Sequence, residues 1–376
     1  MSGIQFVDLK AQYSELKSQI DQRIDDVLNH SAFIQGPEVR ECEETLAKFA
    51  RVGFAVGVAS GTDALQIALM AENIGEGDAV YLPAFTFTAT AEVLMSIGAT
   101  PVFCDVDGRD FNIDCDHLEA QIKKVAAGGK LRSRAIIAVD LFGLPADYER
   151  LGKIAKSHEM FLLADGAQSF GAHYQGGRVG ALASATALSF FPAKPLGCYC
   201  DGGAILTDDG DRAARYRSIG AHGKGDKKYD IVRIGLNSRL DTIQAAILLA
   251  KLTRFEEELR ARDELSQFYD THLADIVEIP FRHNNRQSAW AQYGILLDNR
   301  DDVAAKLKTE GIPTAIYYPR PMHLQSAYKE FGHGKGSLPV SELLSKRILH
   351  LPMHAYMAKE ERDEIVRAIK RVCQRS

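Results

Sequence analysis

The sequence predicts an α/β protein: a large domain with a mostly parallel seven-stranded sheet, followed by a smaller C-terminal α+β domain. Seven short apolar runs of strand length recur up to Thr207, and helical stretches separate many of them. Strands that alternate with helices form largely parallel sheets covered on both faces. After about residue 240 this alternation gives way to a long helical stretch and then to a shorter mixture of helices and strands.

The large domain is predicted to cover residues 1–245 and to begin with helices. Apolar residues recur there at helical spacing: Tyr13, Leu16, Ile20, Ile24 and Val27. A second helical pattern covers about 38–49. The predicted strands follow, each a buried apolar run, at 55–60, 79–82, 101–104, 135–140, 159–165, 185–191 and 203–207. Because binding groups in such sheets lie beyond the carboxyl ends of the strands, we expect the site there.

The second domain is predicted to cover residues 246–376, with a helix linking it to the first. Helical periodicity persists from Arg239 to Leu273, for some 35 residues, with apolar side chains on one face and charges elsewhere. The remaining predicted elements are a strand at 293–298, a helix at 301–310, a strand at 314–318 and a terminal helix from about 358.

Composition and charge argue against several classes of protein. The net charge of -5 and the sequence pI of about 6.1 disfavour a general nucleic-acid binder. The start, MSGIQFVDLKAQY, has no charged region followed by an apolar one, and no apolar run approaches the roughly 20 residues that span a bilayer. The six cysteines contain no CxxC pair, so we expect reduced thiols in a cytoplasmic protein and no metal site.

The first segment of candidate functional residues contains Ser60, Gly61 and Thr62, where a predicted strand gives way to a helix. A helix N-terminus presents unpaired N–H groups and a partial positive charge, so a phosphate group is stabilised there. The segment is neither a Walker loop nor a GxGxxG fingerprint. The same residues also suit a plain helix cap, and that alternative stays open from the sequence.

Two further segments place charged residues at strand ends. Asp165 ends the apolar run EMFLLAD, where a carboxylate is costly unless it has a cationic or hydrogen-bonding partner. It either caps a following helix or faces a protonated pyridine nitrogen. Lys194 follows the run ATALSFF, between two prolines and before several glycines, and therefore lies on a constrained turn. A lysine acts as a Schiff-base nucleophile when burial or nearby charges lower its pKa.

Taken in this order, the segments resemble those of the fold-type I pyridoxal-phosphate (PLP) enzymes, and among them the DegT/StrS-like sugar aminotransferases. The resemblance covers nearly the whole chain and rests on FIQGPEV, SGTDAL, PAFTFTATAEV, VDLFGLPAD, DGAQSFGA, SFFPAKPLG, DGGAI, GLNSRLDTIQAA and YYPRPMHLQ. It implies a homodimer with shared active sites and pyridoxamine phosphate as an intermediate. It also implies that Lys194 carries PLP as a Schiff base and that Asp165 pairs with the pyridine nitrogen.

The resemblance implies further contacts at matching positions. Cofactor contacts are implied for Ser60, Gly61, Thr62 and Ser189 at the phosphate, Gln168 nearby, Phe87 stacked on the ring, and Asn237 from the neighbouring subunit. Substrate contacts are implied for Arg239, Tyr318 and His323. Relatives that are dehydratases carry histidine at the lysine position, so Lys194 favours transamination.

The substrate is also suggested by resemblance. Members that make 4-amino sugars often carry histidine where this chain has Phe191. The stretch FFPAKPLGCYCDGG is closer to members that aminate C3 of UDP-linked 2-acetamido sugars, including the 3-oxo-glucuronic acid, with glutamate as donor, in bacterial surface polysaccharide biosynthesis. A sugar carboxylate requires a cation, and Arg239 or Arg320 is the candidate. The alternative is a 3- or 4-aminotransferase for another UDP- or dTDP-keto-deoxysugar.

Two other classes of protein fit this sequence less well. A NAD-dependent sugar enzyme on a doubly wound sheet would be expected to carry the glycine fingerprint that this sequence lacks. A regulator built on a PLP-enzyme fold would gain support from a basic helix-turn-helix region before the core, and the N-terminal sequence contains none.

Overall fold

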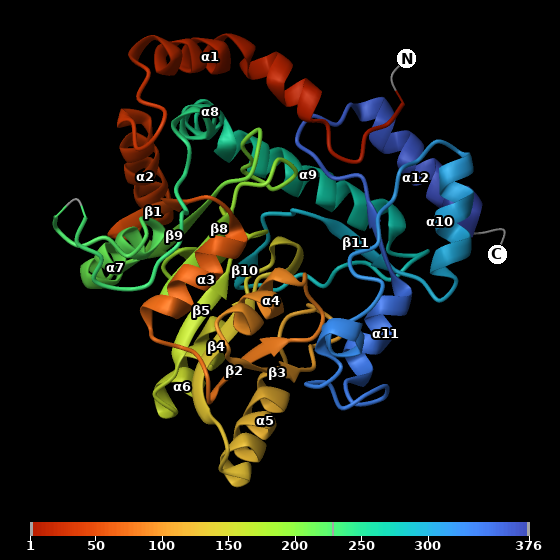
Figure 1. Ribbon diagram of the computed structural model, residues 1–376. Helices are drawn as coiled ribbons and strands as arrows, with labels where there is room; N and C mark the ends of the chain where they lie inside the picture. The colour runs from red at the N-terminus through yellow and green to blue at the C-terminus, as the bar shows by residue number, and fades with distance from the viewer. Residues whose placement is uncertain (1–2, 228, 374–376) are drawn as a thin grey trace.

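The computed structural model, which describes residues 3–227 and 229–373, is built around a seven-stranded sheet (Figure 1). Its strand order is β1-β9-β8-β5-β4-β2-β3. The bounds are β1 (Phe54–Val58), β2 (Asp78–Pro83), β3 (Thr100–Cys104), β4 (Arg132–Val139), β5 (Phe161–Asp165), β8 (Ala185–Ser189) and β9 (Gly203–Thr207). Only β9 runs antiparallel to its neighbours. The mostly parallel seven-stranded sheet is therefore confirmed.

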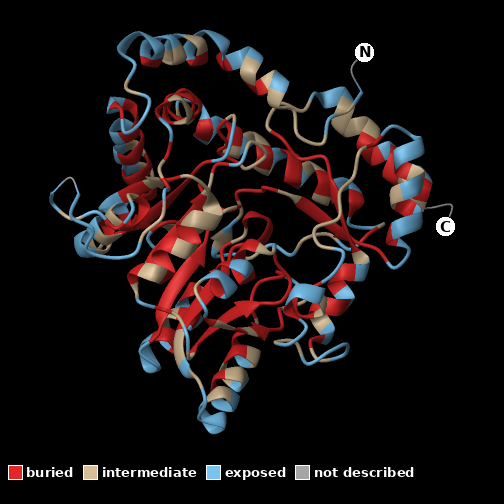
Figure 2. Ribbon diagram, viewed as in Figure 1, coloured by how far each residue is buried: buried red, intermediate tan, exposed pale blue. Residues whose placement is uncertain are grey.

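Helices cover both faces of this sheet, which explains why its strands are almost continuously apolar and buried (Figure 2). One face is covered by α3 (Gly61–Ala71), α4 (Ala89–Ser96) and α7 (Gly210–Gly220). The other is covered by α2 (Pro37–Ala50), α5 (Cys115–Gly128) and α6 (Tyr148–Ser157). The N-terminal helix α1 (Leu9–His30) packs on α8 (Thr242–Leu252) through Leu16, Ile20 and Ile247.

A second apolar core belongs to the C-terminal part of the chain, here called the small lobe. It consists of α9 (Phe255–Leu273), α10 (Arg300–Thr309) and α12 (Lys359–Cys373) around the antiparallel pair β11 (Tyr293–Leu296) and β12 (Ile348–Leu351). The helix α11 (Pro339–Arg347) precedes β12. In the described parts of the chain, no helix combines the length and the hydropathy needed to cross a membrane.

The predicted single helix between Arg239 and Leu273 is wrong, because the structure divides it into α8 and α9. The N–H of Arg254 donates to the carbonyl of Lys251, three residues back, and the Thr253 hydroxyl donates to the carbonyl of Ala250 at 2.7 Å. This tight turn redirects the chain from its packing against α1 and α2 into the small lobe. Apolar spacing continues across the turn, so periodicity does not reveal it.

The predicted strand at 314–318 is also wrong. A single bridge joins Ala315 to His350, and Tyr317 and Tyr318 instead face a cavity. Their aromatic rings pack against Phe85, Phe87 and His350. The apolar run at this position therefore reflects a cavity wall and not a sheet.

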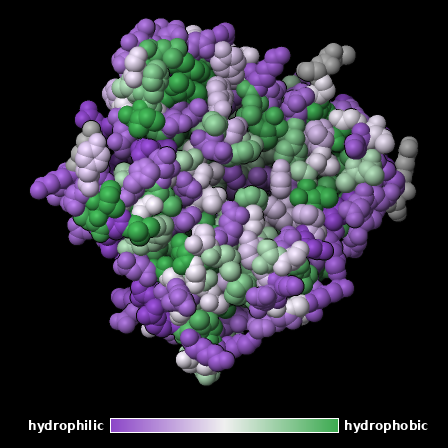
Figure 3. Space-filling view, in the orientation of Figure 1, coloured by the Kyte–Doolittle hydropathy of each residue, from purple (hydrophilic) through white to green (hydrophobic). Residues whose placement is uncertain are grey.

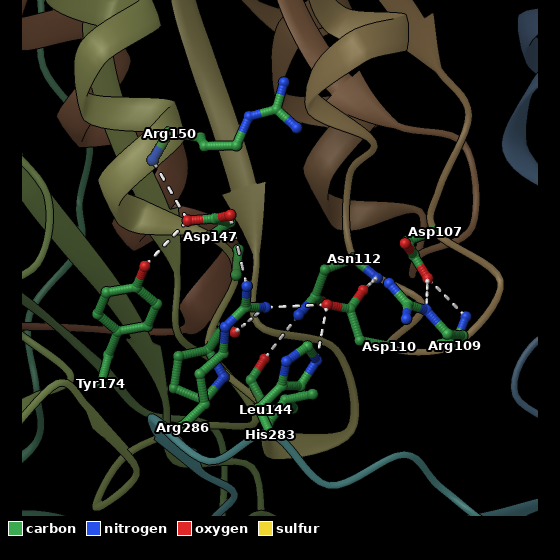
Figure 4. Close-up of polar contacts among 12 residues, drawn as sticks. Asp107, Arg109, Asp110, Asn112, Leu144, Asp147, Arg150, Tyr174, His283 and Arg286 are labelled. Atoms are coloured by element: carbon green, nitrogen blue, oxygen red, sulfur yellow. Dashed lines mark hydrogen bonds and ion pairs between the residues drawn. The ribbon is translucent and has the colours of Figure 1, made fainter.

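A polar cluster joins the loop after β3 to the segment that enters the small lobe (Figure 4). Asp110 accepts a hydrogen bond from Arg286 Nη1 at 2.9 Å and lies 3.2 Å from Nε2 of His283. The other amino group of Arg286 lies 3.5 Å from Asp147. Arg286 belongs to the short strand β10 (Arg286–Gln287), which pairs with β6 (His173–Tyr174), itself paired with β7 (Gly177–Arg178). The cluster fixes the segment before β11 on the large sheet.

Candidate active site

A cavity of about 460 Å³ opens at the carboxyl ends of the parallel strands, where the sequence predicts the site. Its wall includes the start of α3, residues 86–89, the ends of β4 and β5, the loop between β8 and β9, Gln292 and residues 317–318. The cavity brings together nine of the residues predicted from the sequence, which lie far apart along the chain: Ser60, Gly61, Thr62, Phe87, Asp165, Gln168, Ser189, Lys194 and Tyr318.

The start of α3 and the end of β8 form one side of the cavity. Ser60 is the N-cap of α3, and its hydroxyl oxygen accepts a hydrogen bond from the N–H of Asp63 at 3.0 Å. The cap therefore exists, but the hydroxyl hydrogen of Ser60 and the first-turn N–H groups of Gly61 and Thr62 have no intrahelical acceptor. These donors and the Ser189 hydroxyl line the same cavity. The arrangement suits an anion such as a phosphate group.

Gly61 permits the close approach of α3 to β8. A Cβ atom at this position would lie 2.6 Å from Cβ of Ser189. We expect Gly61→Ala to displace the helix N-terminus, lowering stability by about 1–3 kcal/mol through overpacking and weakening cofactor binding. The matched control is Gly152→Ala inside α6, where no atom lies within 4 Å of the added methyl group.

The two variants are compared by their thermal unfolding temperatures and by their affinities for PLP in a titration. Gly152→Ala should be neutral or stabilising by about 0.5–1 kcal/mol, because alanine is the better helix former. Equal affinity of Gly61→Ala and the unsubstituted protein for PLP would contradict the assignment of this side of the cavity to phosphate.

Asp165 places a buried carboxylate at the end of β5. It is 7% exposed and accepts hydrogen bonds from Oγ1 of Thr90 at 2.9 Å and from the N–H of Ala167 at 3.2 Å. Burial raises the pKa of Asp165, against these hydrogen bonds and the charge of Lys194, which lower it. The described residues that follow form turns and no helix, so Asp165 does not cap one. A cation inside the cavity would stabilise its ionised form.

Lys194 lies on the loop between β8 and β9, and its backbone N–H donates to the carbonyl of Phe191 at 2.9 Å. Its side chain lines the cavity that Asp165 also lines. Burial lowers the pKa of Lys194, while the charge of Asp165 opposes that effect. A lower pKa keeps a larger fraction of the amine unprotonated, which is the form that attacks a carbonyl carbon.

Two further predicted residues are linked by a hydrogen bond across the cavity wall. Oε1 of Gln168 accepts from the N–H of Phe142 at 2.6 Å, in the short 3-10 helix Leu141–Gly143, and its Nε2 donates to the Tyr318 hydroxyl at 3.4 Å. Burial raises the pKa of Tyr318, so the phenol remains a proton donor. The exposed ring of Phe87 lies 6.1 Å from that of Tyr318, measured between centroids.

Four predicted residues lie outside this lining. Asn237 and Arg239 are hydrogen-bonded to each other, and Arg239 lines a separate cavity beside α2. Arg320 is exposed to solvent. His323 is buried, and its Nε2 lies 3.2 Å from Oε1 of Glu342, so its ring is directed away from the cavity. Nothing in the geometry of one chain supports substrate contact by His323.

Other residues of the site are not predicted by the sequence. Thr90, on α4, donates to Asp165 from 75 positions earlier, and Gln292 and Asp201 line the cavity. Their local sequence carries no signal for these roles, because the contacts are made only when distant segments meet. The complete site offers a phosphate cradle, a buried carboxylate and a nucleophilic amine in one cavity. These are the groups that a phosphorylated pyridine aldehyde requires.

Comparison with known proteins agrees with this chemistry. A family model described as the DegT/DnrJ/EryC1/StrS aminotransferase family matches residues 14–370. The UDP-2-acetamido-2-deoxy-3-oxo-D-glucuronate aminotransferase of Pseudomonas aeruginosa is 45% identical over 94% of this chain and 96% of its own length. A DegT DnrJ EryC1 StrS aminotransferase from Brucella abortus has a TM-score of 0.97 and 47% identity, covering 98% of this chain and 99% of that one. DesV of S. venezuelae, solved with a ketimine intermediate, has a TM-score of 0.95 and 34% identity over the full length of both chains.

Proposed function

The chain belongs to the DegT/DnrJ/EryC1/StrS aminotransferase family, and on that basis we propose that it transfers an amino group from glutamate to C3 of UDP-2-acetamido-2-deoxy-3-oxo-glucuronic acid. It is a PLP-dependent aminotransferase. The observation that carries the substrate proposal is the 45% identity to the Pseudomonas aeruginosa enzyme over nearly the whole length of both chains. Relatives named for other sugars are less similar, at 38% identity for a UDP-N-acetyl-3-dehydro-alpha-D-glucosamine enzyme and 32–35% for enzymes named for dTDP-linked sugars, which makes the alternative substrates less favoured. We assign the reaction to bacterial surface polysaccharide biosynthesis in the cytoplasm.

The residues of the cavity fit PLP. The donors at Ser60, Gly61 and Thr62 would hold its phosphate, helped by Ser189. Asp165 would hold the pyridine nitrogen in its protonated form, since the buried carboxylate requires a cationic partner. The exposed face of Phe87 would stack on the ring. Bound PLP supplies an electron sink for exchange of the amino group.

Lys194 is proposed to perform both covalent attachment and proton transfer. Its amine, unprotonated in larger part because burial lowers the pKa of Lys194, would hold PLP covalently. When not bound to the cofactor, Nζ would accept the proton from Cα of the amino donor and would act as the acid in the opposite direction for the keto-sugar. Gln168 and Tyr318 fix the wall beside this amine through their hydrogen bond.

We also propose a homodimer in which each subunit completes the site of the other. Asn237 and Arg239 lie outside the cavity of their own chain, as expected for residues that act on a neighbouring subunit. The segment that precedes them exposes Ile231, Val232 and Ile234, an unusual density of apolar side chains for a free surface. Apolar atoms gather at the left edge of Figure 3, over the loop that follows α7.

The substrate proposal is tested with two acceptors that differ only at C6 of the sugar. Glutamate is the donor, and formation of the amino sugar is measured for the UDP-linked 3-oxo acid and for its neutral 6-hydroxy counterpart. We expect kcat/KM to favour the acid by about 100-fold, because a cation built to meet a carboxylate is left unpaired by the neutral sugar.

Arg239→Met and Arg320→Met identify which arginine pairs with the carboxylate of the sugar acid. The variant that removes it should lose the preference for the acid while keeping its rate on the neutral sugar, and the other variant serves as the matched control. Equal use of both acceptors by the unsubstituted protein would refute the acid as substrate.

A further inference from the structure

The loop that carries Lys194 is closed on itself by backbone contacts. The N–H of Cys198 donates to the carbonyl of Phe190 at 2.8 Å, and the N–H of Lys194 donates to that of Phe191 at 2.9 Å. Gly197 passes directly over the start of this loop, since a Cβ atom there would lie 2.5 Å from the carbonyl oxygen of Pro192. Gly197 therefore lies close against the peptides that precede Lys194.

A buried lysine from another element contacts this loop. Lys251 lies in the last turn of α8, is 1% exposed, and its Nζ donates to the carbonyl of Gly197 at 2.6 Å. Its cation also lies 4.2 Å from the centre of the Tyr199 ring. Burial lowers the pKa of Lys251 to about 8, although the charge of Glu258 opposes this effect.

A lysine at this buried position is unfavourable for stability by itself. Removing an ammonium group from water costs free energy, and an apolar side chain of similar volume would fill the space at a lower free-energy cost. An apolar side chain, however, would donate no hydrogen bond to the Gly197 carbonyl. A second contact comes from the same face of α8, two helical turns earlier, where Oε1 of Gln244 accepts from the N–H of Tyr199 at 2.9 Å. Helix α8 thus holds the loop at two points just beyond Lys194.

We propose that Lys251 is a positioning residue for amine transfer, which holds the Lys194 loop in its reactive geometry through the carbonyl of Gly197. The inference rests on the proposed role of Lys194. Reaction rates depend steeply on the placement of a reacting amine, and a shift of about 1 Å can cost about 100-fold. The backbone of a loop is more mobile than that of a strand, so an external anchor has its greatest effect there.

The test compares Lys251→Met with a matched control, Ile247→Ala. Both residues are buried on α8, but Ile247 belongs to the apolar cluster that α1 and the ring of Tyr199 share, and its side chain donates no hydrogen bond to the loop. The control therefore separates loss of apolar packing beside the loop from loss of the hydrogen bond to Gly197. Three quantities are measured on each holoprotein: the single-turnover rate of amine transfer from glutamate, the Tm, and amide hydrogen exchange over residues 190–202. Hydrogen exchange is repeated on the proteins without PLP, so that loop order is read independently of activity.

We expect Lys251→Met to retain bound PLP while its transfer rate falls about 10- to 100-fold and the loop amides exchange faster, with or without PLP. Ile247→Ala should lower Tm yet keep the loop protected and the rate close to that of the unsubstituted protein. A rate within about twofold of the unsubstituted protein for Lys251→Met would overturn the proposal, as would equal losses of rate in both variants at equal Tm.

A second variant covers the case in which Lys251→Met does not yield soluble holoprotein. Lys251→Leu also removes the donor to the Gly197 carbonyl with a smaller apolar side chain, so the same loss of rate and protection is expected, and an unchanged rate would again overturn the proposal. Failure of the proposed function is distinguishable, because the unsubstituted protein itself would then show no transfer from glutamate.

Discussion

Lys194→Ala is expected to abolish the visible absorbance of covalently bound PLP and to lower amine transfer by about 10⁴-fold or more. The side chain lines the cavity, and burial lowers the pKa of its amine, so its removal takes away both the nucleophile and the proton carrier. No other lysine lines this cavity in the described part of the chain, so none replaces it. Absorbance spectra with and without glutamate, and single-turnover rates, measure the two effects.

Lys194→Arg is the matched control for charge. It retains a cation near Asp165 but lacks an amine that forms a covalent bond to the cofactor. We expect it to be as inactive as Lys194→Ala while binding PLP more tightly than that variant. Retention of the visible band and of steady turnover by either variant would refute the assignment of Lys194.

Asp165→Asn is expected to lower the transfer rate by about 100- to 1,000-fold with little change in KM for the sugar. The substitution keeps the shape of the side chain and a partner for Thr90, but it removes the charge that would keep the ring nitrogen protonated. Each pKa unit lost at that nitrogen corresponds to about 1.4 kcal/mol, or tenfold, in its protonation equilibrium. A loss of two to three units therefore gives the expected range.

Asp140→Asn provides the control for removing a buried carboxylate. Asp140 follows the adjacent strand β4 and accepts hydrogen bonds from Ser169 at 2.6 Å and Tyr148 at 2.7 Å, outside the lining of the cavity. Burial raises the pKa of Asp140 to about 7. Its substitution should change stability but leave the transfer rate close to that of the unsubstituted protein. Equal rate losses in the two variants would mean that Asp165 acts through folding and not on the cofactor.

Much of the architecture follows from local sequence patterns. Apolar runs identify the seven strands of the large sheet, because a strand buried on both faces must be apolar throughout. Lys194, Asp165 and Ser60 could be found from the sequence for a related reason. Each lies at or just beyond the end of one of these strands, and parallel strands end at one edge of the sheet.

Other features depend on contacts between distant segments. Thr90 reaches Asp165 and Lys251 reaches Gly197 only because helices pack on particular strands and loops. The division between α8 and α9 follows from the packing of α8 against α1, whereas apolar spacing continues unbroken across it. Tyr317 and Tyr318 line the cavity, and a single bridge at Ala315 joins their segment to β12.

The fold class, the order of the strands along the chain and the residue types at their ends therefore follow from local sequence. These properties depend on the burial and the spacing of apolar residues, and both can be inferred from each segment alone. Tertiary packing is needed to know which side chains meet across the cavity, that His323 contacts Glu342, and that Lys251 holds the loop of Lys194. Such contacts join segments far apart in the chain, and local periodicity contains no information about their partners.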